Sequence, residues 1–532
     1  MAIVKQLDKR SGITYLYEST SRWDKAKRQS RATRRLIGRL DPATGATVPT
    51  DGRMRKAKER AAAAPRDETP PARLFAGATW LLDRIAEQTG LEEDLRRVFP
   101  ESWRELLSVA QFMALSDGMP LYRFGKWGSL HRHPCGHDLP SQRSSELLAS
   151  VAQERIDAFL RLRARRRAGD EAWACDSTSV SSYSTTLRQV RFGRNKENDP
   201  LAQVNLILLF GEKSGLPFYY RKTAGNVPDV KTVRGLVRDL DGLGFGHVRI
   251  VTDRGYYSEA NLDELFGSHH KFLVGVSTSL GFVRKAIAEL APGMNAFGNY
   301  DPGAGANGAT VRIAWAFRRK RPRKGDELRG ERRLYVHVYH SLERATQDQA
   351  RFMRELAQLR EELETDRRVE SHADKYAAYF TVRRTPKRGL RVEPNEAAVA
   401  ERVSRFGYFA LATNEKMTAQ EALHLYRAKD IVEKAFGNLK ERLNLRRLLV
   451  SSEQGLDGKF FVAFVGLVLV SRLHRLMKDA KLYDDLTMDE LLDRLDVIEV
   501  FRRPGERERW GEILEKQKDI YRRLGVEPPP AL

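Results

Sequence analysis

The sequence predicts an α/β protein with more than one domain, on three observations. Strands and helices alternate from about residue 171, several helices precede them over residues 73–168, and residues 1–50 are rich in β-branched and aromatic side chains. A chain of 532 residues is long enough for two to four domains. Hydrophobic residues make up 41% and charged residues 31%, which is typical of a globular protein and excludes a disordered or membrane-embedded chain.

The first 168 residues are predicted to form a small β-rich region and a helical domain. The β-rich region covers residues 1–50, where GITYLYEST and RRLIGRLD combine strand-forming residues with Gly, Asp and Pro. Residues 51–72 are basic and rich in Ala and Pro, as linkers are. Helices are predicted over residues 73–168, where apolar residues recur at helical spacing in LFAGATWLLDRIAEQTGLEEDLRRVF.

The helical domain has two interpretations. Its helix–Gly–helix pattern fits a DNA-reading helix-turn-helix, although any small helical bundle produces the same pattern. The basic stretch RLRARRR, with Arg163, Arg165 and Arg166, is either a solvated helix face or a phosphate contact. If the pattern is a helix-turn-helix and the basic stretch contacts phosphates, residues 73–168 are the DNA-binding domain.

The segment from residue 169 to 276 is predicted to contain three successive strands, a helix and a fourth strand. The strands are AWACDSTSVSS, QVNLILLF and PFYYRKT, the helix is DVKTVRGLVRDLDGLG, and the fourth strand is HVRIVTD. Three strands, a helix and a strand is the opening order of an RNase H-like sheet, although many α/β domains share it.

The remaining chain is predicted to interrupt this core, resume it and end in helices. Residues 277–412 form a β-rich insertion, residues 413–480 the second part of the core, and residues 481–532 a helical C-terminal region. The apolar run Phe460–Val470 is shorter than the about 20 residues that a membrane-spanning helix needs. It predicts a buried core helix.

The charge of the chain favours a polyanionic partner. Lys and Arg outnumber Asp and Glu by 93 to 71, giving a net charge of +22. Such an excess most often indicates nucleic acid, and a basic protein without that role is the alternative. The two cysteines, Cys135 and Cys175, exclude a disulfide framework, and the N-terminus has no apolar stretch resembling a secretion signal. We expect a cytoplasmic protein without a membrane partner.

Two aspartates are placed where strands could bring them together. Alternation along WACDST puts Trp173 and Cys175 on one face of the first strand, with Ala174 and Asp176 on the other. Asp253 ends the fourth strand. If the strands are neighbours, the two carboxylates are close enough to share divalent cations, which offset the repulsion between them. Taken singly, each aspartate is equally well a turn or helix-capping residue.

A third motif lies in LYRAKDIVEKAFGNLKERLNLRR, residues 425–447. If this stretch is one helix, Tyr426, Lys429, Glu433 and Lys440 fall within roughly 60° of one another on one face. The carboxylate could bind metal while the cations and the phenol hold phosphates. An ordinary charged helix face is the alternative. Together the three motifs favour two-metal phosphodiester chemistry.

These motifs resemble those of the DDE transposases of bacterial insertion sequences. The resemblance lies in Asp176 of DST, Asp253 of TDRGYYSEANL and the pattern Tyr426-x2-Lys429-x3-Glu433-x6-Lys440, which is similar to the Tyr-x2-Arg-x3-Glu-x6-Lys motif of one large group. TYLYESTSRWDKAKRQSR, IGRLDPATG, AGNVPD and FALATNE extend it over nearly the whole chain. Lys429 departs from the usual Arg, which keeps the charge but loses bidentate phosphate binding.

The resemblance implies an RNase H-like core with a β-rich insertion, and a catalytic and metal-binding triad of Asp176, Asp253 and Glu433. It implies two Mg²⁺ ions, with Mn²⁺ able to substitute, cleavage at the element's terminal inverted repeats, and joining of the 3′-OH ends to target DNA by a homodimer or larger synaptic assembly. DNA contacts are implied for Tyr426, Lys429, Lys440 and Arg254. An aromatic residue of the insertion could stack on a flipped base, for which Trp315 is a candidate, although core burial is the commoner role of such a Trp.

A histidine- and cysteine-rich stretch is predicted to be a polar loop. In HRHPCGHD, His131, His133, Cys135 and His137 stand at every second position. Zinc sites use paired ligands with a second, distant pair, and the intervening Pro and Gly indicate a loop.

Two other functions share these motifs. A stand-alone metal-dependent DNA nuclease would use the same carboxylates, and the match outside the triad favours transposition over it. A catalytically silent DNA-binding regulator derived from a transposase would have no need for three separated carboxylates.

Overall fold

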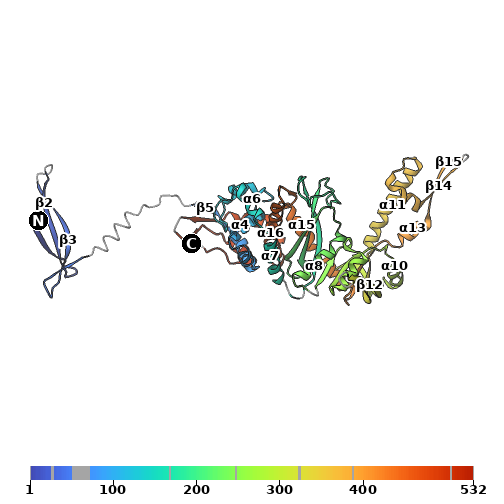
Figure 1. Cartoon of the computed structure of the whole chain (residues 1–532), viewed down its shortest axis with the longest axis horizontal. Coiled ribbons are helices and arrows are strands. Elements are labelled where there is room, and N and C mark those ends of the chain that lie inside the picture. The colour runs from blue at the N-terminus through green and yellow to red at the C-terminus, as the bar shows by residue number, and fades with distance from the viewer. Residues whose placement is uncertain are drawn as a thin grey trace. The chain divides into compact units, whose positions relative to one another are not determined.

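The computed structural model describes residues 2–24, 29–50, 72–166, 169, 171–245, 248–321, 325–385, 389–503 and 506–530. The chain divides into two compact units, residues 1–71 and 72–532 (Figure 1). Most of the predicted linker, residues 51–71, lies outside the described residues, and its last residue, Ala72, begins a strand.

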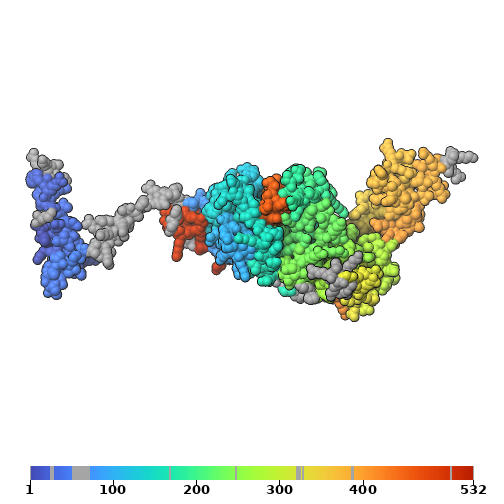
Figure 2. Space-filling view, viewed as in Figure 1, coloured from blue at the N-terminus to red at the C-terminus, as the bar shows by residue number. Residues whose placement is uncertain are grey.

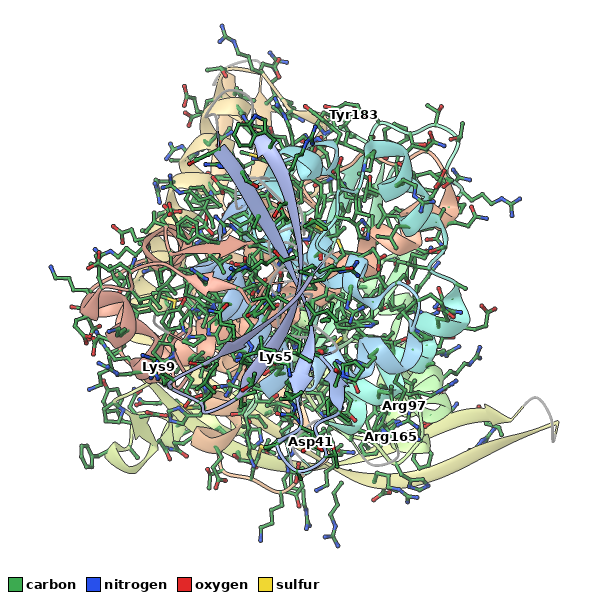
Figure 3. The ribbon with its side chains drawn as sticks, turned by 90° about the vertical axis from the view of Figure 1, so that its left-hand side faces the viewer. Lys5, Lys9, Asp41, Arg97, Arg165 and Tyr183 are labelled. Atoms are coloured by element: carbon green, nitrogen blue, oxygen red, sulfur yellow. The ribbon has the colours of Figure 1, made fainter. Side chains whose placement is uncertain are left out.

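The N-terminal unit is a four-stranded antiparallel sheet in the order β1-β2-β3-β4. Its strands are β1 (Ala2–Leu7), β2 (Thr14–Asp24), β3 (Gln29–Leu40) and β4 (Thr47–Pro49). Asp8 and Asp41 close two of its turns by accepting hydrogen bonds from the backbone N–H groups of Arg10 and Ala43. Figure 3 shows this sheet, with Lys5, Lys9 and Asp41 labelled. Among its described residues, only Leu16 is a buried hydrophobic side chain.

The second unit is built on a mixed sheet whose centre has the order β8-β7-β6-β9-β10. The strands are β6 (Trp173–Ser182), β7 (Gln203–Gly211), β8 (Pro217–Ala224), β9 (Arg249–Thr252) and β10 (Lys271–Val276). β6, β7 and β8 are antiparallel neighbours, whereas β6, β9 and β10 run parallel. Helix α8 (Val233–Gly242) connects β8 to β9, and α9 (Glu259–Gly267) connects β9 to β10. The predicted RNase H-like core is confirmed.

The insertion extends this sheet instead of forming a separate one. Beyond β10 the order continues as β16-β13-β12-β11, with every pair antiparallel. These strands are β11 (Tyr300–Asp301), β12 (Ala306–Arg321), β13 (Asp326–His340) and β16 (Tyr408–Thr413). Backbone hydrogen bonds between β10 and β16 therefore link the insertion directly to the core.

The rest of the insertion is largely helical. It contains α10 (Gly281–Leu290), α11 (Leu342–Glu364), α12 (Ala373–Tyr379), α13 (Glu396–Val403) and the hairpin of β14 (Phe380–Thr385) with β15 (Gly389–Pro394). Leu359 and Leu363 of α11 share a small core with Tyr376, Phe380 and Val392. The insertion thus has more helix than the β-rich segment that the sequence predicts.

The helical region and the C-terminal helices form one body with the sheet. The region contains α2 (Gly77–Gln88), α3 (Leu91–Val98), α4 (Trp103–Leu115), α5 (Phe124–Gly128), α6 (Ser141–Ala149) and α7 (Gln153–Arg165). Its buried side chains belong to one hydrophobic cluster with those of α16 (Glu453–Asp479), α17 (Met488–Asp496), α18 (Glu515–Arg523) and the sheet. In Figure 2 its blue and cyan residues adjoin both the green sheet and the red C-terminal residues.

The C-terminal region contains strands as well as helices. β18 (Glu499–Arg502) pairs with both β5 (Ala72–Phe75) and β19 (Arg509–Trp510). In the second part of the core, β17 (Arg447–Leu448) pairs with β6. Short 3₁₀ turns complete the second unit: η1 (Leu121–Arg123), η2 (Asp229–Lys231), η3 (Arg254–Tyr256), η4 (Ala291–Gly293), η5 (Phe297–Asn299), η6 (Glu370–His372) and η7 (Leu482–Asp484).

Helix α16 carries the long apolar run. By length and composition it could cross a membrane, but 78% of its most apolar window is buried inside the protein. It packs against α4, α6 and β8. This is the buried core helix that the sequence predicts.

The stretch predicted as one helix over residues 425–447 is two helices, α14 (Ala419–Arg427) and α15 (Asp430–Glu441). Between them the backbone makes tighter hydrogen bonds, from Lys429 N–H to Tyr426 O and from Val432 N–H to Lys429 O. Such three-residue spacing interrupts the α-helical ladder and changes the direction in which later side chains point. Tyr426 and Lys440 are therefore not on one continuous helix face.

Candidate active site

The parallel pairing of β6 with β9 brings Asp176 and Asp253 together. Cys175 pairs with Thr252 in this register. Asp176 and Asp253, each one residue further along, therefore occupy the next pair of positions at the same edge of the sheet. The Asp176 side chain is 13% exposed, so it is largely enclosed.

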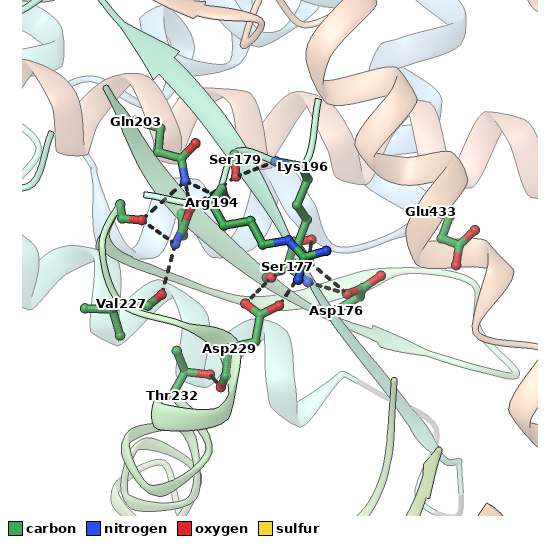
Figure 4. Close-up of polar contacts among 12 residues, drawn as sticks. Asp176, Ser177, Ser179, Arg194, Lys196, Gln203, Val227, Asp229, Thr232 and Glu433 are labelled. Atoms are coloured by element: carbon green, nitrogen blue, oxygen red, sulfur yellow. Dashed lines mark hydrogen bonds and ion pairs between the residues drawn. The ribbon is translucent and has the colours of Figure 1, made fainter. Parts of the chain in front are cut away.

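A cavity of about 1210 Å³ contains the three predicted acidic residues. Asp176, Asp253 and Glu433 all line it, together with Tyr426 and Arg254. Glu433 comes from α15, which packs against β6 and β7. Figure 4 shows both residues, with Asp176 on the strand β6 and Glu433 on the helix α15. Tertiary packing thus places three carboxylates that are remote in the chain on one cavity.

The two aspartates have pKa values shifted in opposite directions. Burial raises the pKa of Asp176, and the charge of Asp253 adds to this rise, although Lys196 and Lys429 act against it. Burial also acts to raise the pKa of Asp253, but hydrogen bonds from the Arg254 backbone N–H and the Tyr426 hydroxyl outweigh it and lower that pKa. Asp253 therefore stays ionised at lower pH than Asp176.

Lys429 connects the acidic groups. Its Nζ lies 2.9 Å from Oε1 of Glu433 and 3.9 Å from Oδ2 of Asp176, and the residue is 6% exposed. Burial acts to lower the pKa of Lys429, but the hydrogen bond to Glu433 and the charges of Asp176 and Asp253 raise it overall. Lys429 thus compensates carboxylate charge here and is not free at the surface to meet a phosphate.

The other implied DNA contacts on α14 and α15 are also engaged with acidic residues. The Tyr426 hydroxyl donates to Oδ1 of Asp253 at 2.8 Å. Lys440, 9% exposed, lies with its Nζ 2.5 Å from Oε1 of Glu197 and does not line the cavity. Arg254 is exposed and lines the cavity, so its guanidinium is accessible there.

Arg163 and Arg166 have a structural role that the sequence does not indicate. Both donate to Oδ2 of Asp94, at 3.1 and 2.8 Å, and Arg163 is only 3% exposed. In this structure the guanidinium of Arg163 is therefore buried in an ion pair instead of facing solvent as the phosphate-contact interpretation would require. Arg165 is exposed on the same helix, α7.

Trp315 packs as a core residue. It lies on β12, where its Nε1 donates to Oδ1 of Asp263 at 3.0 Å and its ring meets the edge of Phe282. Its indole N–H is engaged and its ring is partly buried against the core, which is the commoner role of such a Trp, and the base-stacking role stays a prediction.

The side chains of the histidine- and cysteine-rich loop contact other parts of the protein, and Cys135 Sγ also lies 3.4 Å from Nδ1 of His133. His131 bonds to Trp127 O and Asp496, His133 to Ser108, and His137 lies near Glu105. No group of three or more His, Cys, Asp or Glu side chains in the described part of the chain is arranged to hold a metal ion. In the cavity, the ammonium group of Lys429 lies between the carboxylates of Asp176 and Glu433.

Sequence reasoning missed two residues of the cavity, Lys196 and Asp229. Lys196 comes from the loop between β6 and β7 (residues 183–202), and its Nζ lies 3.1 Å from Oδ2 of Asp229 and 3.6 Å from Oδ1 of Asp176. Asp229 opens η2 and accepts a hydrogen bond from Ser177 Oγ at 2.5 Å. Asp229 ends the motif AGNVPD, which was a usable signal; Lys196 lies in an irregular loop with no periodic pattern.

Gly275 on β10 allows Tyr426 to approach Asp253. A Cβ at this position would lie 2.9 Å from the Tyr426 hydroxyl oxygen and 3.1 Å from the backbone nitrogen of Arg254. Both distances are too short for ordinary contact, so a side chain here would displace one of the two donors to Asp253.

Replacing Tyr426 by Phe is expected to raise the pKa of Asp253, because the hydroxyl stabilises the ionised carboxylate. The folded-state pKa of Asp253 is depressed, so its stabilising contribution is present above the unfolded-state pKa and is lost as pH falls through the folded-state pKa. In the variant this loss begins at higher pH. Carbon-13 NMR of the aspartate carboxyls measures it, and Tyr122→Phe, which changes an exposed tyrosine outside the cavity, is the control. An unchanged Asp253 pKa would contradict the assignment.

Comparison with known proteins identifies the family of this chain. Residues 167–469, more than half of the chain, match the family described as "Transposase DDE domain". Among solved structures, a cryo-EM structure of a piggyBac transposase synaptic complex with hairpin DNA matches at 9% identity and a TM-score of 0.37, over 79% of this chain and 75% of that chain. No curated protein sequence matches. The family match spans Asp176, Asp253 and Glu433, and the chain belongs to the DDE transposase family, whose members are DNA-cleaving enzymes that use divalent metal ions.

Proposed function

We propose that this transposase binds the ends of an insertion sequence, cleaves DNA phosphodiester bonds with two Mg²⁺ ions and joins the 3′-hydroxyl ends to target DNA. The observation that carries the proposal is the placement of Asp176, Asp253 and Glu433 on one cavity. A binding protein without catalysis has no use for three carboxylates that repel one another in an enclosed space.

The donor chemistry of the cavity fits divalent cations. Carboxylate oxygens are the ligands that Mg²⁺ prefers, and Mn²⁺ accepts the same set. Asp176 and Asp253 would hold the ions from adjacent strands, and Glu433, whose side chain is 59% exposed, would hold them from α15. Bound Mg²⁺ activates an attacking hydroxyl and stabilises the leaving oxygen of a phosphodiester.

The protein's own residues would keep the acidic site ready for this chemistry. Tyr426 and the Arg254 backbone N–H hold Asp253 in its ionised form, which is the form that binds metal. Lys429 holds Glu433 close to Asp176 through its ammonium group. Arg254, which is exposed and lines the cavity, would meet a phosphate of the DNA strand.

Double-stranded DNA is the proposed partner, as terminal inverted repeats and as target. The net charge of +22 favours a polyanion, and neutralisation of phosphates makes such binding weaken as salt rises. Joining two ends to one target requires both ends in one assembly, so we infer a homodimer or larger complex on DNA.

A strand-joining assay tests this function. The protein is incubated with Mg²⁺, a labelled duplex carrying the terminal inverted repeat that flanks its gene, and a supercoiled plasmid. We expect cut ends and their covalent attachment to the plasmid, and neither product when EDTA replaces Mg²⁺. Cleavage without joining would instead identify a stand-alone nuclease, and binding without cleavage would identify a regulator derived from a transposase.

A further inference from the structure

The ammonium group of Lys196 is surrounded by oxygen atoms of the active-site cavity. Its Nζ lies 2.6 Å from the carbonyl oxygen and 2.7 Å from Oγ of Ser177. Two carboxylates complete the surroundings, Asp229 Oδ2 at 3.1 Å and Asp176 Oδ1 at 3.6 Å. Figure 4 shows these groups converging on Lys196. A carbonyl, a hydroxyl and two carboxylates are also the oxygen donors that bind a hard divalent cation.

The loop that carries Lys196 is anchored by two ion pairs directly after it. Glu197 pairs with Lys440 of α15, with Oε1 and Nζ 2.5 Å apart. Asp199 pairs with Arg447 of β17, with Oδ2 and Nη1 2.5 Å apart. The first contact attaches the loop (residues 183–202) to the helix that bears Glu433, and the second attaches it to β17, which pairs with β6, so the position of the loop next to Lys196 is fixed by the fold.

Lys196 and Lys429 each face a different oxygen of the Asp176 carboxylate. Lys196 faces Oδ1 at 3.6 Å and Lys429 faces Oδ2 at 3.9 Å. The two lysines differ in exposure, because Lys429 is buried whereas the Lys196 side chain is 40% exposed. Lys196 therefore has solvent into which its ammonium can move.

We propose that Lys196 is a tethered counter-ion that competes with a divalent cation for Asp176, an inference that rests on the proposed metal chemistry. A divalent cation on the same carboxylate would repel an ammonium group a few ångströms away, and this repulsion is strong in a partly desolvated site. Cation entry thus requires Lys196 to leave Asp176. By this competition the fold keeps the acidic cavity charge-compensated and lowers its intrinsic metal affinity.

The test measures Mn²⁺ affinity without DNA, by isothermal titration calorimetry and by the electron paramagnetic resonance signal of free Mn²⁺. Lys196→Met and Lys196→Gln are expected to bind Mn²⁺ more tightly than the wild type, by about two- to fivefold, which is the range of a partly exposed ion pair. Lys196→Arg keeps the charge and is expected to keep the wild-type affinity. Lys231→Met, which removes an exposed lysine just after Asp229 that does not line the cavity, is the matched control.

Wild-type affinity in Lys196→Met and Lys196→Gln would overturn the inference while leaving the metal chemistry standing, provided that Asp176→Asn abolishes binding. If no protein in the series binds Mn²⁺, the proposed metal chemistry fails and the inference fails with it. Thermal unfolding gives a second readout: Mn²⁺ is expected to raise the Tm of Lys196→Met more than that of the wild type. An equal rise in both proteins would count against the competition.

Discussion

Asp176→Asn, Asp253→Asn and Glu433→Gln are each expected to lower Mg²⁺-dependent cleavage of end DNA by about 10³-fold or more. The change removes a charged metal ligand while keeping the size of the side chain, and metal stabilisation of the transition state contributes several kcal/mol. DNA affinity is expected to stay near the wild-type value, because binding depends on cationic residues and not on these acids. Cleavage is measured on labelled duplex in denaturing gels, and affinity by fluorescence anisotropy.

Glu259→Gln is the control for charge removal. Glu259 is an exposed acid in the first turn of α9, close in sequence to Asp253 but not part of the cavity lining. It is expected to cleave at the wild-type rate. If any of the three active-site variants also cleaves at that rate, the corresponding carboxylate is not part of the catalytic site.

Asp94→Ala is expected to destabilise the second unit by about 3–5 kcal/mol, because it leaves the guanidinium of Arg163 buried without its carboxylate partner. Asp94 is 2% exposed and Arg163 3%, and Arg166 shares the same carboxylate oxygen. The burial that lowers the pKa of Arg163 reflects the same desolvation cost. Urea unfolding followed by circular dichroism measures the loss.

Two further variants distinguish the stability contribution of a buried ion pair from that of a surface ion pair. Glu146→Ala breaks the Arg143 pair on α6, whose side chains are 75% and 50% exposed, and is expected to cost less than about 1 kcal/mol. Combining Asp94→Ala with Arg163→Met removes the unpaired charge and is expected to recover much of the lost stability. Equal losses from Asp94→Ala and Glu146→Ala would show that the buried pair has no special role.

Local patterns in the sequence were sufficient for the core. The strand runs that became β6, β7, β8 and β9 and the amphipathic helix α8 were predictable, since side-chain period follows backbone geometry within a few residues. The same holds for α16, whose unbroken apolar run can only be buried or lie in a membrane. The extension of the sheet by β16, β13 and β12 was not predictable, because strand order depends on pairing between segments far apart in the chain.

The helix over residues 425–447 shows where periodicity fails. Its residues suit a continuous helix, but the turn at Lys429 separates Tyr426 from Glu433 and aims Lys440 at Glu197. Arg163 is a second case in which the local pattern fails. A basic run on a helix indicates a solvated face, but here Asp94, which is remote in the chain, pairs with Arg163 in a buried position. The local sequence pattern predicts neither Glu197 as the partner of Lys440 nor Asp94 as the partner of Arg163.

The sequence by itself determined the family and predicted three carboxylates that the structure places on one cavity, because residue types at fixed spacing within short motifs carry that information. Only the tertiary structure decided which cations compensate those carboxylates. Lys196 and Asp229 enter the site through contacts between residues 20 and 33 positions apart in the chain, from Lys196 to Asp176 and from Lys196 to Asp229. Charge pairing depends on distance in space, and burial strengthens it, so these partners follow from the folded arrangement of β6, η2 and the loop (residues 183–202).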